Sequence, residues 1–298
     1  MRILLFGKTG QVGWELQRSL SPLGDVIAVG RKDADFLDLK GLRAFTLEVR
    51  PDLIVNAAAY TAVDKAESEP AIAMRINGEA PGVLAEVAKK LGIGLVHYST
   101  DYVFDGTKGK PYTEDDEPNP INVYGKTKLA GDLAIQSSGW AYIILRTSWV
   151  YGARGENFFL TILRLAREKD VIRVVDDQIG CPTWCGSIAD ATASVLRRLG
   201  IVEPDGTWKD KGGFYNCSAG GETSWFEFAR AILEYEQVRR GAQWAPPDLQ
   251  PIGKEAYEAD APRPRYSVLD GSKLERAFDV KIASWQAQLA YCFGNMKN

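Results

Sequence analysis

The sequence has 298 residues, and its 36 Lys and Arg against 39 Asp and Glu give a formal net charge of −3. This balance argues against a nucleic-acid-binding protein held by phosphate contacts. No run of eighteen apolar residues occurs and residues 1–20 lack a signal-peptide pattern, so we expect no membrane span. The four cysteines are few for the length, which fits a cytoplasmic protein without a zinc site.

The first predicted unit is a strand at residues 2–6, a glycine-rich turn and a helix that continues to Leu20. Gly7 allows a sharp exit from the strand, Gly10 lets a pyrophosphate approach the backbone, and Gly13 lets the helix pack close to the strand. Free N–H groups at the start of the helix favour phosphates. The Gly-x-x-Gly-x-x-Gly spacing is typical of short-chain dehydrogenase/reductases.

Further apolar runs predict strands at residues 25–29, 53–56, 95–99 and 141–146, and these alternate with helices predicted at 40–49, 71–91 and 122–137. Such alternation predicts an α/β fold, a Rossmann-type doubly wound parallel sheet with right-handed crossovers. Ligands bind outside the carboxyl ends of such strands. Residues 105–120 are rich in Gly and Pro and predict a long irregular loop, of a kind that is usually either functional or disordered.

Past residue 150 the alternation loosens. We expect helices at 157–167, 187–199 and 225–235, a strand at 172–175, a polar, turn-rich stretch at 201–213 and mostly loop at 240–265. We therefore assign residues 1–150 to an NAD(P)-binding Rossmann domain, to which later segments return. Residues 151–298 form mainly a smaller C-terminal substrate-binding lobe.

Tyr124 and Lys128 stand four apart on a predicted helix and so share one face. A free tyrosine has a pKa near ~10, and a nearby ammonium lowers the pKa by stabilising the phenolate. We predict a decrease of about 3 units, which needs about 4 kcal/mol from Lys128 and the positive ring of a cofactor. Ser99 or Thr100 supplies a hydroxyl beside Tyr124. Successive strand side chains point to opposite faces, and the spacing leaves this choice open.

His97 is the one histidine of the chain, and it lies inside an apolar run at residues 94–99. We expect it to be packed in the core. A Ser-His-Asp hydrolase would have to use it, but the sequence has no Gly-x-Ser-x-Gly elbow.

Several motifs spread over nearly the whole chain resemble one known family. They are Gly7–Gly13, Asn56–Glu67, Ser99–Phe104, Tyr124–Lys128, Arg146–Tyr151, Asp177–Thr183, and Arg263-Pro264 with Ser267. Together they resemble the dTDP-4-dehydrorhamnose reductases, which are extended short-chain dehydrogenase/reductases. The resemblance implies reduction of the C4 ketone of dTDP-4-dehydro-L-rhamnose by NAD(P)H, the last step of dTDP-L-rhamnose synthesis. Lipopolysaccharide and O-antigen synthesis are the associated processes.

The resemblance also implies roles for individual residues. Thr100 is the hydroxyl of the catalytic triad, Tyr124 the proton donor and Lys128 its partner. The sugar pocket is implied to contain Thr100, Asp101, Tyr124 and Trp149. The cofactor contacts that we expect are Gly7, Gly10, Gln11, Val12, Gly13, Arg31, Asp35, Phe36, Ala57, Ala58, Ala59, Tyr60, Thr61, Tyr98, Tyr124 and Lys128.

The end of the second strand bears on cofactor choice. NAD-specific sites usually place an acid there, but here the residue is Arg31, whose planar guanidinium can pair with a 2′-phosphate. We therefore predict NADPH. Asp33 and Asp35 lie close to Arg31 in the sequence, so NADH remains an alternative cofactor.

Some members of the family bind Mg²⁺ at a dimer interface through glutamates. Glu15 matches one such ligand, but Gly186 stands near the position of a second. One carboxylate does not make a Mg²⁺ cage, so we expect no metal. The sequence leaves the oligomeric state open, with a homodimer as one option.

Two other functions stay open. Related 4,6-dehydratases carry Asp-Glu directly after the threonine, whereas here Asp101 is followed by Tyr102, and an epimerase needs a second base. A non-catalytic regulatory subunit on the same fold is the other alternative, but it has no need to keep Thr100, Tyr124 and Lys128 together.

Overall fold

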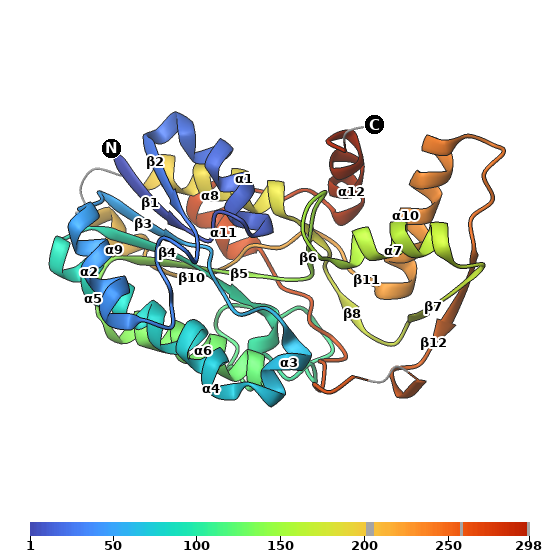
Figure 1. Ribbon diagram of the computed structural model, residues 1–298, viewed down its shortest axis with the longest axis horizontal. Helices are drawn as coiled ribbons and strands as arrows, with labels where there is room; N and C mark the ends of the chain where they lie inside the picture. The colour runs from blue at the N-terminus through green and yellow to red at the C-terminus, as the bar shows by residue number, and fades with distance from the viewer. Residues whose placement is uncertain (201–205, 257–258, 297–298) are drawn as a thin grey trace.

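The computed structural model describes residues 1–200, 206–256 and 259–296. Its larger part is built on a six-stranded sheet with the order β10-β5-β4-β3-β1-β2, in which every neighbouring pair is parallel (Figure 1). The strands are β1 (Arg2–Phe6), β2 (Asp25–Val29), β3 (Leu53–Asn56), β4 (Gly94–Thr100), β5 (Tyr142–Thr147) and β10 (Gly213–Asn216). The predicted doubly wound α/β fold is confirmed.

Helices cover both faces of this sheet, as the two helical layers in Figure 1 show. Along β1, Ile3 and Leu5 face one layer while Leu4 and Phe6 face the other, because strand side chains alternate. The first layer is α1 (Gln11–Leu20), α8 (Cys185–Leu199) and α11 (Ser272–Phe278), and the second is α2 (Leu39–Val49), α5 (Ala80–Leu91) and α6 (Val123–Ser137). Because helices cover both faces, every residue of β3 and β4 is buried.

The helix predicted at 71–91 is interrupted, so that prediction was wrong in detail. After α3 (Val63–Ser68) and α4 (Pro70–Met74), residues Arg75–Glu79 form a π-helical turn that leads into α5. The π turn buries Asn77 against α6, where a Cβ on Gly131 would collide with the Asn77 carbonyl oxygen. Turns of this kind are frequent at functional sites.

The polar stretch predicted at 201–213 was wrong from residue 206 onward, while residues 201–205 lie outside the described residues. Helix α9 (Gly206–Lys211) buries Trp208, and β10 follows it and pairs with β5 at the edge of the sheet. The helix has one buried tryptophan among polar residues, so its sequence shows no apolar periodicity from which a helix could be predicted. A segment far beyond residue 150 therefore returns to the main sheet.

The smaller lobe packs α7 (Phe158–Glu168), α10 (Trp225–Arg240) and α12 (Trp285–Gly294) around Phe159, Phe228 and Leu289. Strand β7 (Val171–Val175) pairs in parallel with β12 (Asp248–Ile252), so the loop predicted at 240–265 was wrong there. Pro251 is tolerated because a two-stranded pair leaves each strand one free edge. Short strands join the lobe to the sheet: β6 (Val150–Tyr151), β8 (Ile179–Gly180), β9 (Thr183–Trp184) and β11 (Thr223–Ser224).

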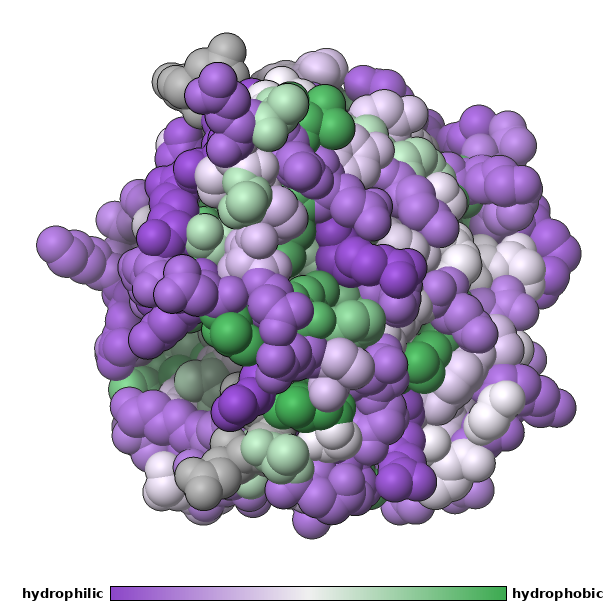
Figure 2. All heavy atoms as spheres, turned by 90° about the vertical axis from the view of Figure 1, so that its right-hand side faces the viewer, coloured by the Kyte–Doolittle hydropathy of each residue, from purple (hydrophilic) through white to green (hydrophobic). Residues whose placement is uncertain are grey.

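Figure 2 shows the outer end of the smaller lobe, where hydrophilic side chains cover most of the surface and hydrophobic ones gather in small groups. Val238 on α10 and Val171 on β7 are among the exposed apolar residues. Among the described residues, no helix combines the length and apolar character that crossing a membrane requires.

Candidate active site

Two adjoining cavities lie where β1, β3 and β4 end, the edge at which a doubly wound sheet binds ligands. The larger has a volume of about 610 Å³ and is called here the Tyr124 cavity. The smaller has a volume of about 420 Å³ and is called the Arg31 cavity. Both are lined by Thr9, Gly10, Ala57, Ala59 and Thr61, so the glycine turn forms their common wall.

The glycine turn fits a dinucleotide pyrophosphate. Gly7 has φ +87°, and a Cβ there would lie 2.7 Å from the backbone of Ala57. Gly13 lies behind the turn, where a Cβ would collide with the carbonyl oxygen of Gly7. Gly10 caps α1 without a side-chain hydrogen bond, and Gln11 and Val12 line the Tyr124 cavity. A helix that begins at the wall of a cavity with free backbone N–H groups can bind a phosphate there.

The Arg31 cavity contains the residues expected to surround the adenosine end of a cofactor. Arg31 is 74% exposed, and its Nε lies 3.8 Å from Oδ2 of Asp35. Beside the cavity, next to Gly30, Lys8 donates from Nζ to Oδ2 of Asp33 at 2.8 Å and holds the pKa of that carboxyl below its ordinary value; the sequence interpretation missed this lysine. The lining residues named in advance are Gly7, Gly10, Arg31, Asp35, Phe36, Ala57, Ala58, Ala59, Tyr60 and Thr61.

Asn77 is a second residue that sequence reasoning missed. The N–H of Tyr60 donates to Oδ1 of Asn77 at 2.8 Å, and Nδ2 of Asn77 donates to the Tyr60 carbonyl at 3.0 Å and to Oγ1 of Thr127 at 3.2 Å. The buried amide therefore ties the loop that lines both cavities to α6. Its place in the π turn gave no signal in the sequence.

Tyr124 and Lys128 reach the Tyr124 cavity from the first turns of α6. This helix begins at Asn122, whose Oδ1 accepts the Gly125 N–H at 2.8 Å while Nδ2 donates to the Pro262 carbonyl at 2.8 Å. The cap satisfies a free N–H of the helix start and fixes the direction of the helix. The segment around Pro262, from the C-terminal half, thus helps to orient Tyr124.

Thr100 and Ser99 are distinguished by their contacts. The Ser99 hydroxyl donates to Oδ2 of Asp132 at 2.6 Å. Oγ1 of Thr100 accepts the Tyr102 N–H at 3.1 Å, and Thr100 lines the cavity beside Tyr124 and acts to lower the pKa of its phenol. The geometry therefore brings Thr100, and not Ser99, together with the phenol.

The electrostatics of Tyr124 differ from the prediction. Burial raises the pKa of Tyr124 above its ordinary value, hydrogen bonding with Thr100 opposes this rise, and the charge of Asp101 adds to it. Lys128 donates from Nζ to the Tyr98 carbonyl at 2.6 Å, and burial lowers its pKa to about 8. We predicted that Lys128 lowers the pKa of Tyr124, but in the protein without cofactor the pKa is raised. Burial disfavours both the phenolate of Tyr124 and the ammonium of Lys128. A raised pKa keeps the phenol protonated.

Two indole rings border the far side of the Tyr124 cavity. Trp149 has φ +46°, a conformation uncommon for a non-glycine residue, and its ring stacks on that of Trp225 with centroids 3.5 Å apart. Gly180 leaves room for the ring of Trp149, which a Cβ there would strike. Trp225 was not predicted, although its position directly after the N-cap Ser224 is a signal that could have been used.

Asp101 and Tyr98 also line the Tyr124 cavity, as expected. Asp101 is 2% exposed and accepts from the Ser148 hydroxyl at 2.9 Å and from the Thr100 hydroxyl at 3.1 Å. Burial raises the pKa of Asp101 to about 6. The Tyr98 hydroxyl bonds to Oγ1 of Thr192 on α8 at 2.8 Å, so its phenol is anchored in the core.

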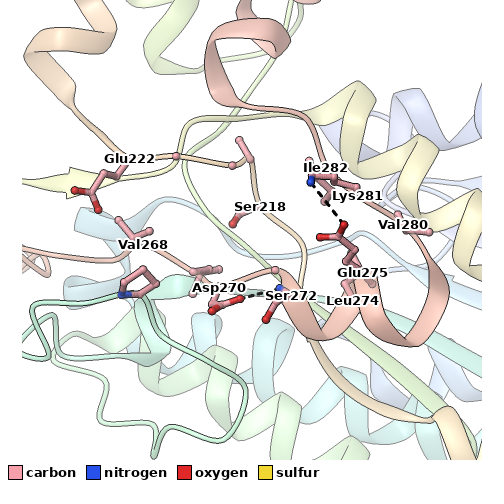
Figure 3. A pocket seen from close by; sticks show the side chains of 16 residues that line it. Ser218, Glu222, Val268, Asp270, Ser272, Leu274, Glu275, Val280, Lys281 and Ile282 are labelled. Atoms are coloured by element: carbon pink, nitrogen blue, oxygen red, sulfur yellow. Dashed lines mark hydrogen bonds and ion pairs between the residues drawn. The ribbon is translucent and has the colours of Figure 1, made fainter.

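A separate cavity of about 520 Å³, drawn in Figure 3, lies beside α11 and contains none of these residues. Its charged groups are already engaged: Nζ of Lys281 lies 3.7 Å from Oε1 of Glu275, and Asp270 accepts the Ser272 N–H at 2.8 Å. The chemistry that the sequence predicts therefore belongs to the two adjoining cavities at the sheet edge.

Glu15 forms an ion pair with Arg18 at 3.7 Å, and a Cβ at Gly186 would strike the ring of Trp184. In the described ranges no three His, Cys, Asp or Glu side chains are grouped to hold a metal ion. The four cysteines are buried free thiols.

The family described as "RmlD substrate binding domain" matches residues 1–298. The chain belongs to this family. A dTDP-4-dehydrorhamnose reductase of Burkholderia thailandensis is 45% identical over 293 residues, which cover 98% of each chain. One from Salmonella typhimurium is 46% identical over 290 residues, covering 96% of this chain and 95% of the relative.

Solved structures agree with this membership. A dTDP-4-dehydrorhamnose reductase of Bacillus anthracis, solved in complex with NADP, is 34% identical with a TM-score of 0.88 and 99% coverage of both chains. One from Clostridium acetobutylicum is also 34% identical, with a TM-score of 0.89 and 99% coverage of both chains. A UDP-glucose 4-epimerase of Thermus thermophilus is 20% identical with a TM-score of 0.77, which shows the shared fold alone.

Proposed function

We propose that this protein reduces the C4 ketone of dTDP-4-dehydro-L-rhamnose to dTDP-L-rhamnose with NADPH. The observation that carries the proposal is the meeting of Thr100, Tyr124 and Lys128 in one cavity whose wall is a pyrophosphate-binding glycine turn. The two bacterial relatives described above are named for this activity, and they align with nearly the whole chain. The Bacillus anthracis relative with bound NADP supports NADPH as the cofactor.

We assign the binding of the cofactor to the residues of the shared wall and of the Arg31 cavity. Backbone N–H groups at Gly10, Gln11 and Val12 hold the pyrophosphate. Arg31 lines the Arg31 cavity with a largely exposed side chain, so its guanidinium can pair with a 2′-phosphate, while Lys8 holds Asp33 in an ion pair beside the cavity. This arrangement favours a 2′-phosphate over a bare hydroxyl. When bound, the cofactor supplies the hydride.

The protein's own residues supply the proton. The Tyr124 hydroxyl donates it to the C4 oxygen, and Thr100 holds that oxygen by a hydrogen bond. Lys128 stabilises the phenolate that remains, since the positive charge of an ammonium favours the ionised form. Asp101 orients Thr100 through the bond of 3.1 Å between their side chains. Trp149 and Trp225 cover the apolar face of the sugar.

The place of Tyr102 supports reduction over dehydration. Its ring packs edge-to-face on Tyr124 with centroids 5.6 Å apart, where a dehydratase would carry a carboxylate. A single reduction needs one proton, which Tyr124 supplies, and Tyr102 adds no carboxylate for an elimination. A protein of this kind releases its oxidised cofactor in each cycle, and we expect it to purify largely free of nucleotide.

Three further assignments belong to the same proposal. Residues 1–150 provide the cofactor site and residues 151–298 most of the remaining substrate contacts, as Trp225 and Asn157 in the Tyr124 cavity indicate. The protein acts in the cytoplasm, which suits its free thiols. It forms a homodimer, and the exposed side chains of Trp14 and Tyr291 offer apolar surface for the contact. Light scattering after size-exclusion chromatography tests the oligomeric state.

The decisive assay follows NADPH oxidation with the dTDP-linked 4-keto-6-deoxy sugar and with its GDP- and UDP-linked counterparts. We expect turnover with the dTDP-linked sugar and a much lower kcat/KM with the other two. Turnover of dTDP-glucose without added NADPH would replace the proposed reductase with a dehydratase.

A further inference from the structure

His97 is fully buried, as predicted, yet both of its ring nitrogens have polar partners. Nδ1 lies 3.1 Å from Nδ2 of Asn56, and Nε2 lies 3.1 Å from Nζ of Lys128. The partner of Nε2 is the lysine that lines the Tyr124 cavity together with Tyr124. Burying polar atoms is costly unless they are hydrogen-bonded, so both contacts contribute to holding the ring in place.

The chain of contacts continues into the wall of the cofactor site. Oδ1 of Asn56 accepts the Ala58 N–H at 3.1 Å, and Ala58 lines the Arg31 cavity. Four groups are thus linked in sequence: the backbone at Ala58, the amide of Asn56, the imidazole of His97 and the amine of Lys128. Asn56 ends β3 and His97 lies beside it on β4, paired in register, so the sheet itself sets their separation.

The Asn56 amide also determines where the imidazole proton lies. Because Oδ1 accepts from a backbone N–H, Nδ2 is the atom that faces His97, and an amide nitrogen is a donor. Nδ1 of His97 is therefore the acceptor, and the proton of the neutral ring is on Nε2, facing Lys128. Burial and the charge of Lys128 hold the pKa of His97 well below its ordinary value, which keeps the ring neutral.

An N–H directed at Nζ favours the uncharged amine of Lys128 over the ammonium. Other charged groups act on the same lysine from different elements. Asp132, one turn along α6, favours the ammonium, and Arg146 on β5 in turn holds the charge of Asp132. Tyr124 shares the cavity with Lys128. Burial lowers the pKa of Lys128 to about 8, and Nε2 of His97 lies between Nζ of Lys128 at 3.1 Å and Oδ1 of Asp132 at 3.9 Å.

We infer that His97 is a positioning residue, which fixes Nζ of Lys128 at the wall of the Tyr124 cavity and links it through Asn56 to the loop that lines the cofactor site. The inference rests on the proposed function, because it assigns His97 to the reduction carried out by Tyr124. His97 itself touches neither proton nor hydride in transit. Its effect is on where Lys128 lies and on how firmly it holds its proton.

Two matched variants test this. His97→Gln keeps a polar atom near the place of Nε2 and so retains the contact with Lys128, whereas His97→Asn keeps one near Nδ1 and retains only the contact with Asn56. Asn is one methylene smaller than Gln and leaves a larger void, so the free energy of unfolding of both variants is measured beside kcat to separate lost packing from the lost contact. A 1 Å displacement of a reacting group can cost about 10²-fold in rate. We expect kcat of His97→Asn to fall about 10- to 100-fold and that of His97→Gln to stay within about threefold of the unmutated protein.

The pH profile of kcat provides a second measurement. Without the N–H of His97, Lys128 keeps its proton to higher pH, so the alkaline limb of the His97→Asn profile moves upward while KM for the keto sugar changes little. Equal loss in both variants, or full activity in His97→Asn, would overturn the inference. Inactivity of the unmutated protein on the dTDP-linked keto sugar would instead refute the proposed function, so the two failures are distinguishable.

Discussion

The Tyr124 cavity and the Arg31 cavity share the glycine turn, but the charged side chains around them differ in how far they are buried. Around Tyr124, the side chains of Lys128, Asp101 and Asp132 are each at most 2% exposed, and burial shifts the pKa of each toward the neutral form. At the Arg31 cavity, the ion pair of Arg31 with Asp35 and the neighbouring pair of Lys8 with Asp33 are exposed to solvent and screened by it. Changes near Tyr124 should therefore have large effects, and changes near Arg31 small ones.

The largest effect is expected from Tyr124→Phe, which keeps the ring and removes only the hydroxyl. Loss of a general acid typically costs roughly 10²–10⁴-fold, so kcat for the keto sugar should fall by that factor. The affinity for NADPH, measured by fluorescence titration, should change little, because the glycine turn provides the main contacts. If the variant kept most of its turnover, Tyr124 would not be the proton donor.

Asp101→Asn tests how buried charge affects stability near Tyr124. The pKa of Asp101 is raised from 3.8 to about 6, so its contribution to stability is present below pH 4 and is lost as the pH rises through 6. The free energy of unfolding of the unmutated protein should therefore fall relative to Asp101→Asn by about 2–3 kcal/mol between pH 4 and pH 7. Denaturant unfolding at several pH values measures this.

Glu234→Gln on the exposed face of α10 is the matched control for Asp101→Asn. Its stability relative to the unmutated protein should vary little over the same pH range. If the Asp101→Asn difference stayed constant with pH, the carboxyl would not be held in its neutral form.

Trp149→Leu should have a moderate effect. An aromatic pair contributes about 0.5–1.5 kcal/mol beyond the area it buries, so loss of the stack on Trp225 should raise KM for the sugar about 3- to 10-fold. The change in kcat should be smaller, because the ring lies away from the proton donor. Trp140→Leu, a tryptophan outside the Tyr124 cavity, is the control. Equal effects on KM in both variants would argue against a role of Trp149 in binding.

The smallest effect is expected at the exposed end of the cofactor site. Solvent-exposed ion pairs contribute about 0–1 kcal/mol, so Arg31→Ala should narrow the preference for NADPH over NADH by at most about fivefold. The ratio of kcat/KM for the two cofactors measures this. Equal use of NADH and NADPH by the unmutated protein would contradict the role given to Arg31.

The sequence predicted those features that depend on local patterns. The glycine turn, the strand–helix alternation and the polar strand ends are local, and they led to the sheet and to Thr100, Tyr124 and Lys128. Strand β10 could not be predicted in the same way, because its four residues follow a polar helix and pair with β5, far back in the chain. Pro251 concealed β12, since proline usually marks a loop.

Within the site, the residues that escaped prediction act through other residues. Asn77 depends on a π turn with no sequence signal, and Lys8 depends on the approach of the turn to Asp33. His97 was correctly predicted to be buried, but its contact with Lys128 requires β3, β4 and α6 to be placed together. Such contacts are set by tertiary packing, which spacing along one element does not reveal.

The most direct test of the assigned chemistry follows the hydride itself. The protein is incubated with the dTDP-linked 4-keto sugar and NADPH that carries deuterium at both C4 positions of the nicotinamide, and the product is analysed by NMR. We predict one deuterium at C4 of the 6-deoxy sugar for each cofactor oxidised, at an initial rate roughly 10²–10⁴-fold lower with Tyr124→Phe. A product without deuterium, formed while NADPH is not consumed, would contradict the account.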